Sequence, residues 1–129
     1  MLDEGAVLTR RERLSSICLA LPEVSERAQD GHVAFLVRGK TFAYFLNNHH
    51  GDGRVALVCK AQPGAQAILV DAEPARFFVP AYLGPRGWLG LSLEGDVDWG
   101  EVTGFVVEAY RMTATKRMIS AMGQGVPLP

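Results

Sequence analysis

The sequence predicts a two-layer α+β fold, an α/β sandwich in which helices cover one face of an antiparallel sheet. Strand-like segments follow one another directly, as strands joined by hairpins do, and three other segments have helical periodicity. The chain of 129 residues is 48% hydrophobic, enough to form one core. The expected order is α-β-β-β-α-β-β-α, in a single domain spanning residues 1–129.

The first helix is predicted from a capping box and an apolar stripe. Thr9 and Glu12 have the spacing of a capping box, and apolar residues recur at helical spacing from Leu14 to Leu21. Pro22 ends this helix.

Residues 32–46 alternate as two strands of a hairpin. We expect a Gly39-Lys40 turn in which Arg38 pairs with Thr41. This register places the large apolar side chains of both strands on one face, beneath the helices. They are Val33, Phe35, Val37, Phe42, Tyr44 and Leu46.

The stretch LNNHHGDGRVAL, residues 46–57, has two interpretations. His49, His50 and Asp52 have metal-ligand chemistry, but a zinc site needs three or four ligands and only His32 remains elsewhere. Asp52-Gly53 is a strong hairpin signal, followed by a third strand at residues 54–60. We therefore expect a turn and no metal site.

The second half of the chain predicts a helix, two strands and a last helix. Pro63 and Pro74 bracket the helix, and residues 76–79 and 87–93 read as strands joined by a loop. Asp98 and Glu101 form an acidic capping pair before the last helix. The inner stripe of that helix is Trp99, Val102, Val106, Ala109 and Thr113.

Composition excludes several classes. The 13 Lys and Arg residues nearly balance the 14 Asp and Glu residues, giving a net charge of −1, so any nucleic-acid contact must be a local patch. No apolar run spans a membrane, and the N-terminus does not resemble a secretory signal, so the expected location is the cytoplasm. Cys18 and Cys59 fall in apolar patterns and are expected to be core residues.

Catalysis is not expected. No serine has a nucleophile-elbow context, and no P-loop is present. Capping explains Asp98, which leaves Asp96 without an acid–base partner. We expect a binding module without enzymatic activity, cofactor or metal.

The sequence resembles the MmcQ/YjbR family, small bacterial proteins often described as DNA-binding. The resemblance depends on the order of five segments: Phe35–Ala43, Cys59-Lys60, Phe77–Leu91, Val97–Val102 and Ala109–Arg117. It implies a fold similar to that of secretion chaperones, and DNA binding as the first candidate function. Where the family commonly has Ala-Pro-Lys, this chain has Ala114-Thr115-Lys116, so we expect the last helix to continue through residues 116–122.

Candidate phosphate contacts lie in two basic groups. One group surrounds the first hairpin and the other lies near the C-terminus, where no acid interrupts it. They are Arg38, Lys40, Lys60, Arg111, Lys116 and Arg117. The alternative interpretation is an ordinary charged surface that solvates the protein and favours a helix C-terminus.

The loop between the last two strands is a second candidate site. Tyr82 and Trp88 have aromatic rings suited to stacking on a ligand, and Arg86 is placed to hold an anion. Core packing is the better interpretation for Trp99 and Tyr110, which share one helix face.

The expected outer face of the sheet is apolar and needs a cover. Its residues are Ala34, Leu36, Ala43, Phe45, Ala56 and Val58. The candidate covers are a second protomer or a partner protein contacting Leu36, Phe45 and Val58, a small ligand, or the chain's own C-terminal segment. A protein-interaction or small-ligand-binding domain that uses this face is the alternative function.

Overall fold

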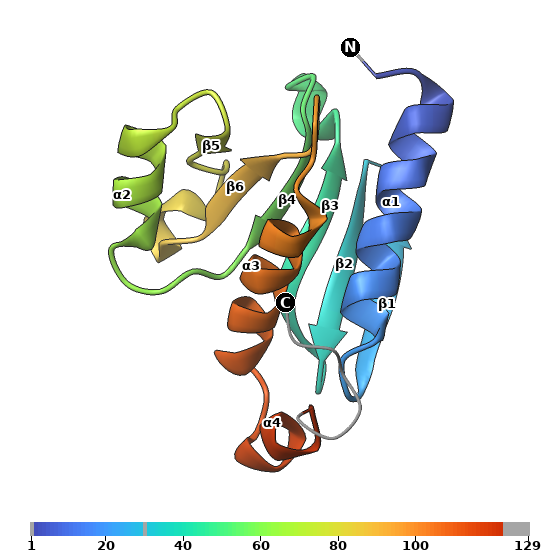
Figure 1. Cartoon of the computed structure of the whole chain (residues 1–129), viewed down its shortest axis with the longest axis vertical. Helices are drawn as coiled ribbons and strands as arrows, with labels where there is room; N and C mark the ends of the chain where they lie inside the picture. The colour runs from blue at the N-terminus through green and yellow to red at the C-terminus, as the bar shows by residue number, and fades with distance from the viewer. Residues whose placement is uncertain (1, 30, 123–129) are drawn as a thin grey trace.

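Six strands form one antiparallel sheet in the order β1-β2-β3-β4-β6-β5. The computed structural model describes residues 2–29 and 31–122, with the side chain of His50 not among them. The strands are β1 (Val24–Gln29), β2 (His32–Val37), β3 (Lys40–Asn47), β4 (Val55–Cys59), β5 (Phe77–Phe78) and β6 (Leu89–Ser92). Helices α1 (Glu4–Leu19) and α3 (Trp99–Arg111) lie on one face of the sheet, as Figure 1 shows. The predicted α+β fold class is confirmed.

Two smaller helices complete the order. Helix α2 (Ala65–Ala72) lies beside β5 and β6, and α4 (Lys116–Met122) lies at the end of the molecule that contains the β2–β3 turn (Figure 1). Short 3₁₀ turns occur at His49–Gly51 and Gly84–Arg86. In the described part of the chain, no helix has the length and apolar character needed to cross a membrane.

Strand β1 was not predicted. Its sequence, VSERAQ, has no apolar alternation, and five of its six residues are exposed. It forms because its backbone pairs with β2 along its whole length, from Val24 opposite Val37 to Gln29 opposite His32. Exposed charges such as Glu26 and Arg27 suit an edge strand, since they discourage pairing with another chain.

The predicted start of the first helix and the predicted end of the last helix were both wrong. Helix α1 begins at Glu4, because Asp3 Oδ1 accepts a hydrogen bond from Ala6 N at 2.7 Å, while Thr9 lies within the helix. The last helix does not continue through residue 122. It ends at Arg111, and α4 starts anew after Thr115, whose Oγ1 accepts a hydrogen bond from Met118 N.

The predicted register of the β2–β3 hairpin was also wrong. Arg38 and Gly39 form the two-residue turn, with φ values of 55° and 74°, so Val37 pairs with Lys40. A bulge follows, where the register shifts between Phe35 and Leu36. Phe42 is thereby the extra residue on β3.

The bulge changes which side chains of β3 face the helices. Phe42, Ala43 and Phe45 all belong to the main core cluster. Tyr44 pairs with Ala34, and Leu46 pairs with His32, on the opposite face. The expectation that Tyr44 and Leu46 lie beneath the helices, and that Ala43 and Phe45 lie outside, is therefore reversed.

Tyr110 joins the helices to the sheet. Its side chain is fully buried, its ring packs edge-on against Phe42 with centroids 5.8 Å apart, and its hydroxyl donates to Pro22 O at 2.8 Å. Burial and the nearby Glu23 raise the pKa of Tyr110. The hydroxyl therefore keeps its proton, and remains a hydrogen-bond donor, to a higher pH than an ordinary tyrosine does. The predicted Asp98 cap is confirmed, since Asp98 Oδ1 accepts from Glu101 N at 3.1 Å.

We call the sheet face opposite α1 and α3 the reverse face. Ala34, Leu36, Ala56 and Val58 lie on it and are buried, which confirms that it is apolar and covered. Much of the cover comes from the chain itself. Phe78 lies over Gly90, and the loop Val79–Trp88, called loop 79–88 below, packs over β3 and β4.

This cover corrects the expected partner surface. Leu36 and Val58 are buried on the reverse face, and Phe45 is buried beneath the helices, so these side chains form no exposed patch. The C-terminal segment was another expected cover. Its described part, α4, places Met118 and Met122 in the main core cluster, and residues 123–129 lie outside the described residues.

Replacing Gly90 by alanine is expected to destabilise the protein by roughly 1–3 kcal/mol, the usual cost of overpacking. A Cβ at this position would overlap the ring of Phe78, which is itself covered by the Arg54 guanidinium 3.9 Å from the ring centroid. Urea unfolding would measure the change.

Gly104→Ala is the matched control for that substitution. A Cβ at Gly104, on α3, would meet nothing within 4 Å, so the same change should stabilise the helix by roughly 0.5–1 kcal/mol. Equal effects at the two glycines would contradict the proposed packing of Phe78.

Candidate functional sites

Three cations from separate segments converge at one end of the sheet. Lys40 begins β3, Lys60 follows β4, and Arg86 lies in loop 79–88; we call these three residues the cationic cluster. Lys60 N donates to Phe42 O at 3.1 Å, which extends the pairing of β3 and β4 and keeps Lys60 beside the start of β3. The positive charges of Arg86 and Lys40 both act on the Lys60 amine.

No carboxylate of the described residues forms an ion pair with the cationic cluster. Partial burial, followed by the like charges of Arg86 and Lys40, lowers the pKa of Lys60 from its ordinary value. Within residues 2–29 and 31–122, ion pairs involve only Arg76, which contacts Glu73 and Glu101. A bound anion would therefore relieve repulsion among the three cations.

The other predicted phosphate contacts lie near the same end. Arg38 forms the β2–β3 turn and is exposed. Arg111, Lys116 and Arg117 are exposed where α3 ends and α4 begins, and Figure 1 places α4 at the end of the molecule that holds the β2–β3 turn. They belong to the helical layer, whereas Arg86 belongs to the loop over the reverse face.

Loop 79–88 holds its three predicted ligand residues differently. Tyr82 is 78% exposed, and its φ of 66° is a left-handed conformation that is unusual for a bulky residue. Arg86 is also exposed. Trp88 is only 4% exposed and packs on Tyr44, with ring centroids 6.0 Å apart, so the expectation that it offers a ring to a ligand is corrected.

Hydrogen bonds from α2 and within the loop hold this conformation. Gln66 Nε2 donates to Gly84 O at 3.0 Å and to Trp88 O at 2.6 Å. Leu83 N donates to Ala81 O, and Gly84 N donates to Pro80 O, on either side of Tyr82. The loop is thus anchored at its base, and Tyr82 projects from its tip.

A cavity of about 240 Å³ lies between the loop and the reverse face; we call it the reverse-face pocket. Among the residues that line it are His32, Tyr44, Leu46, Val58, Tyr82 and Leu83. The His32 ring packs edge-on against Tyr44 and His49, with centroids 5.8 and 5.1 Å away. Among the described residues, His32 Nδ1 is the one buried side-chain nitrogen or oxygen without a hydrogen-bond partner.

His32 was not predicted as a site residue, although its position in the sequence indicates one. Antiparallel pairing brings the start of β2 beside the end of β3, so His32 must lie near the turn that contains His49. That turn is confirmed as a β3–β4 connection: Gly53 N donates to Asn48 Oδ1, and Arg54 N donates to Asp52 Oδ1.

No group of three or more potential metal ligands occurs among the described side chains. His32 and His49 approach one another through their rings, and the side chain of His50 lies outside those described. Asp52 accepts a hydrogen bond from the Arg54 backbone N–H within the turn, so its carboxylate has a structural role there.

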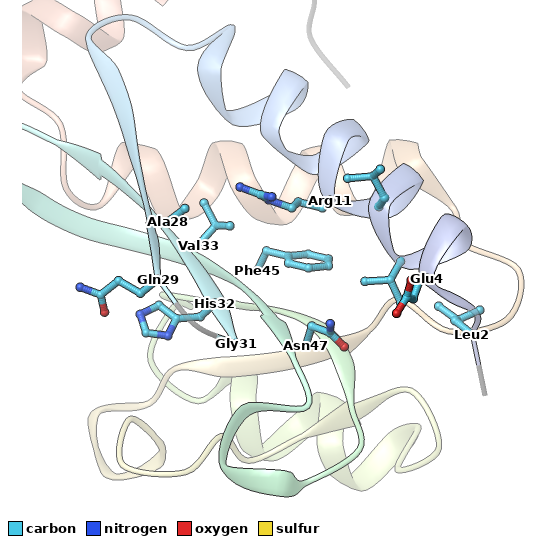
Figure 2. Close-up of a pocket in the computed structure, with 12 residues that line it drawn as sticks. Leu2, Glu4, Arg11, Ala28, Gln29, Gly31, His32, Val33, Phe45 and Asn47 are labelled. Carbon is cyan, nitrogen blue, oxygen red and sulfur yellow. The ribbon is translucent and has the colours of Figure 1, made fainter.

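A larger hollow of about 400 Å³ lies between α1 and the ends of β1 to β3 (Figure 2). Arg11 and Glu4 contribute opposite charges from α1, and Phe45 lies at its floor. The ring of His32 is directed away from Phe45 in Figure 2, as strand alternation requires. His32 lines this hollow as well as the reverse-face pocket, so its Nδ1, which has no hydrogen-bond partner, does not by itself distinguish the two.

The two cysteines are core residues, as predicted. Both are buried and free. Burial raises the pKa of Cys59 to about 12, and burial together with Cys59 and Glu26 raises the pKa of Cys18 well above its usual range. Neither thiol is suited to act as a nucleophile.

Comparison with known proteins adds a family match and a solved fold. The family model described as YjbR matches residues 19–112. Protein DR2400 of Deinococcus radiodurans, a DUF419 domain, has a similar structure with a TM-score of 0.68 and 22% sequence identity, over 92% of this chain and 88% of that chain. At this identity the likeness concerns the fold. No curated protein matches the sequence.

The amine of Lys60 is expected to titrate below the ordinary lysine range, and Arg86→Ala should raise its pKa by removing a like charge. Since only the neutral amine reacts with acylating reagents, Lys60 in the wild type should be labelled at a lower pH than in the variant. Competitive labelling followed by peptide mass spectrometry measures this. Arg27→Ala, which removes the same charge from the β1 edge, is the control, and an identical Lys60 titration in Arg86→Ala would refute the cluster.

Both thiols are expected to resist DTNB in the folded protein at pH 8, because their raised pKa values leave almost no thiolate and burial prevents access. Two thiols should react once the protein is unfolded in guanidinium chloride. Rapid native labelling of either cysteine would show that the core is not packed as described.

Proposed function

The chain belongs to the YjbR family, and from that premise we propose that it is a binding module that contacts the phosphate backbone of nucleic acid, in the first place DNA, through the cationic cluster. The observation that supports this proposal is the convergence of Lys40, Lys60 and Arg86 without a carboxylate partner among the described residues. Phosphate oxygens are the anions that such a cluster of Lys and Arg side chains recognises.

The surface around the cluster favours an extended anion over a single small one. Only Gly39 separates Arg38 from Lys40 in the sequence, and Arg38 is exposed at the turn. Arg111, Lys116 and Arg117 continue the positive charge around the same end of the molecule (Figure 1). A polymer with regularly spaced phosphates can engage several of these positions at once, whereas one small anion reaches only the cluster.

The net charge of −1 is compatible with this proposal because the cations are local. Acidic residues such as Glu23 and Glu26 lie beside and within β1, and the sheet order places β1 two strands away from β3. Because Arg27 on β1 partly offsets these acids, that edge stays close to neutral, and the cationic end is the part of the molecule that would face DNA in a salt-dependent contact.

Binding of fluorescently labelled DNA, measured by anisotropy over a range of salt concentrations, tests the proposal. Three or four phosphate contacts predict a slope of log K against log salt of about −2 to −4. The double variant Lys60→Ala/Arg86→Ala should weaken binding and reduce the magnitude of the slope by about 1 to 2, because two phosphate contacts are lost.

The matched control is Arg13→Ala/Arg27→Ala, which also removes two positive charges, one from α1 and one from β1. Its salt slope should equal that of the wild type. Failure of the wild type to bind DNA at low salt, or equal slopes in the two double variants, would defeat the proposal. A third variant, Arg111→Ala/Lys116→Ala/Arg117→Ala, measures how far the contact surface extends.

A further inference from the structure

The reverse-face pocket and the cationic cluster lie next to each other where β4 ends, since the hydrogen bond from Lys60 N to Phe42 O extends the strand pairing to Lys60. Val58 lines the pocket, and Lys60 follows it by two residues. Residues at this spacing on a strand point to the same face and lie roughly 7 Å apart. On the covering loop, Leu83 lines the pocket and Arg86 belongs to the cluster three residues later.

We propose that the reverse-face pocket receives the base of an unpaired nucleotide while the cationic cluster holds the adjoining phosphate. This inference rests on the proposed function and narrows it to single-stranded nucleic acid, because a base that is paired in a duplex is not free to enter a pocket.

The lining of the pocket suits an uncharged aromatic ring. Tyr44 from β3 and Tyr82 from loop 79–88 contribute aromatic side chains, and Leu46, Val58 and Leu83 contribute apolar surface. The lining contains no Asp, Glu, Lys or Arg. A cavity of about 150 Å³ is enough to bind benzene, so about 240 Å³ has room for a base of one or two rings.

His32 supplies the polar group that selects a base over a plain hydrocarbon. Its Nδ1 is buried without a hydrogen-bond partner, which is a costly arrangement unless a ligand satisfies it. An imidazole nitrogen donates or accepts according to its tautomer, and the edges of bases offer both complementary groups. The His32 ring packs against Tyr44 and is one of the side chains that line the pocket.

The shape of loop 79–88 agrees with a binding role. Tyr82 adopts φ 66° at the loop tip, while hydrogen bonds at Leu83 and Gly84 maintain the turn on either side. Strained conformations of this kind persist where the surrounding structure enforces them, and they concentrate at binding sites. The exposed ring of Tyr82 is thereby presented beside the pocket to a ligand that arrives from solvent.

The test compares a labelled 12-nucleotide single strand with the corresponding duplex in 50 mM salt. The wild type should prefer the single strand. Tyr82→Ala should lower single-strand affinity roughly five- to tenfold through loss of stacking, and should leave duplex affinity unchanged. His32→Phe keeps a ring and removes the hydrogen-bonding nitrogen, and Leu46→Trp fills the pocket, so both should also reduce the preference.

Ile68→Ala is the matched control, because Ile68 is 69% exposed on α2 and does not line the pocket. Its single-strand affinity should equal that of the wild type. Unfolding temperatures of all the variants, measured in parallel, separate lost binding from lost folding.

A second probe tests the pocket without any phosphate. Adenosine and thymidine, titrated to millimolar concentration, should shift the methyl NMR signals of Val58 and Leu83 in the wild type and leave them unmoved in Leu46→Trp. Equal affinity for single strand and duplex, with no nucleoside shifts, would overturn the pocket proposal and leave the proposed function in place. Absence of all DNA binding would overturn the proposed function, and the nucleoside titration would then decide the base pocket alone.

Discussion

The register of the β2–β3 hairpin is the constraint on which the rest of the structure depends. Arg38 and Gly39 both adopt positive φ, which closes a two-residue turn and pairs Val37 with Lys40. The bulge after the next pair then changes the alternation of β3. One arrangement of the backbone thus sends Phe45 to the helices and Tyr44 to the reverse face, where it forms the wall of the pocket.

Local chemistry made much of the fold predictable. The Asp98 cap and the Asp52-Gly53 turn each depend on residues a few positions apart, and both occur as expected. Strand β1 forms through pairing with β2, and its own sequence has no apolar alternation from which a strand could be predicted. The hairpin register was missed because Gly39 suits two turns equally well, and only the bulge at Phe42 reconciles the observed turn with a packed core.

Individual site residues could be predicted from the sequence, but which of them lie close together in the structure could not. Lys40, Lys60 and Arg86 are separate basic positions in the sequence, and only the paired strands and the covering loop bring their charges together. Trp88 was misplaced for the same reason. A tryptophan after a glycine-rich turn looks exposed, yet the loop folds back and packs its ring on Tyr44. Burial of this kind depends on contacts between segments far apart in sequence.

The cover of the reverse face explains why a binding site arises there. An apolar sheet face must be shielded from water, and loop 79–88 shields it with Trp88 over Tyr44 and with Pro80 and Leu83 beside Val58. A loop covers a sheet face less closely than a helix does, because its backbone has to turn and its N–H and C=O groups need hydrogen-bond partners outside a regular element. Tyr82 and Leu83, at the turn of this loop, line the cavity that remains between the loop and the sheet. The strand register places Tyr44, Leu46 and Val58 on the sheet side of that cavity, and the loop adds Tyr82, Leu83 and the neighbouring Arg86, so the apolar walls and the cations both depend on the sheet and its cover together.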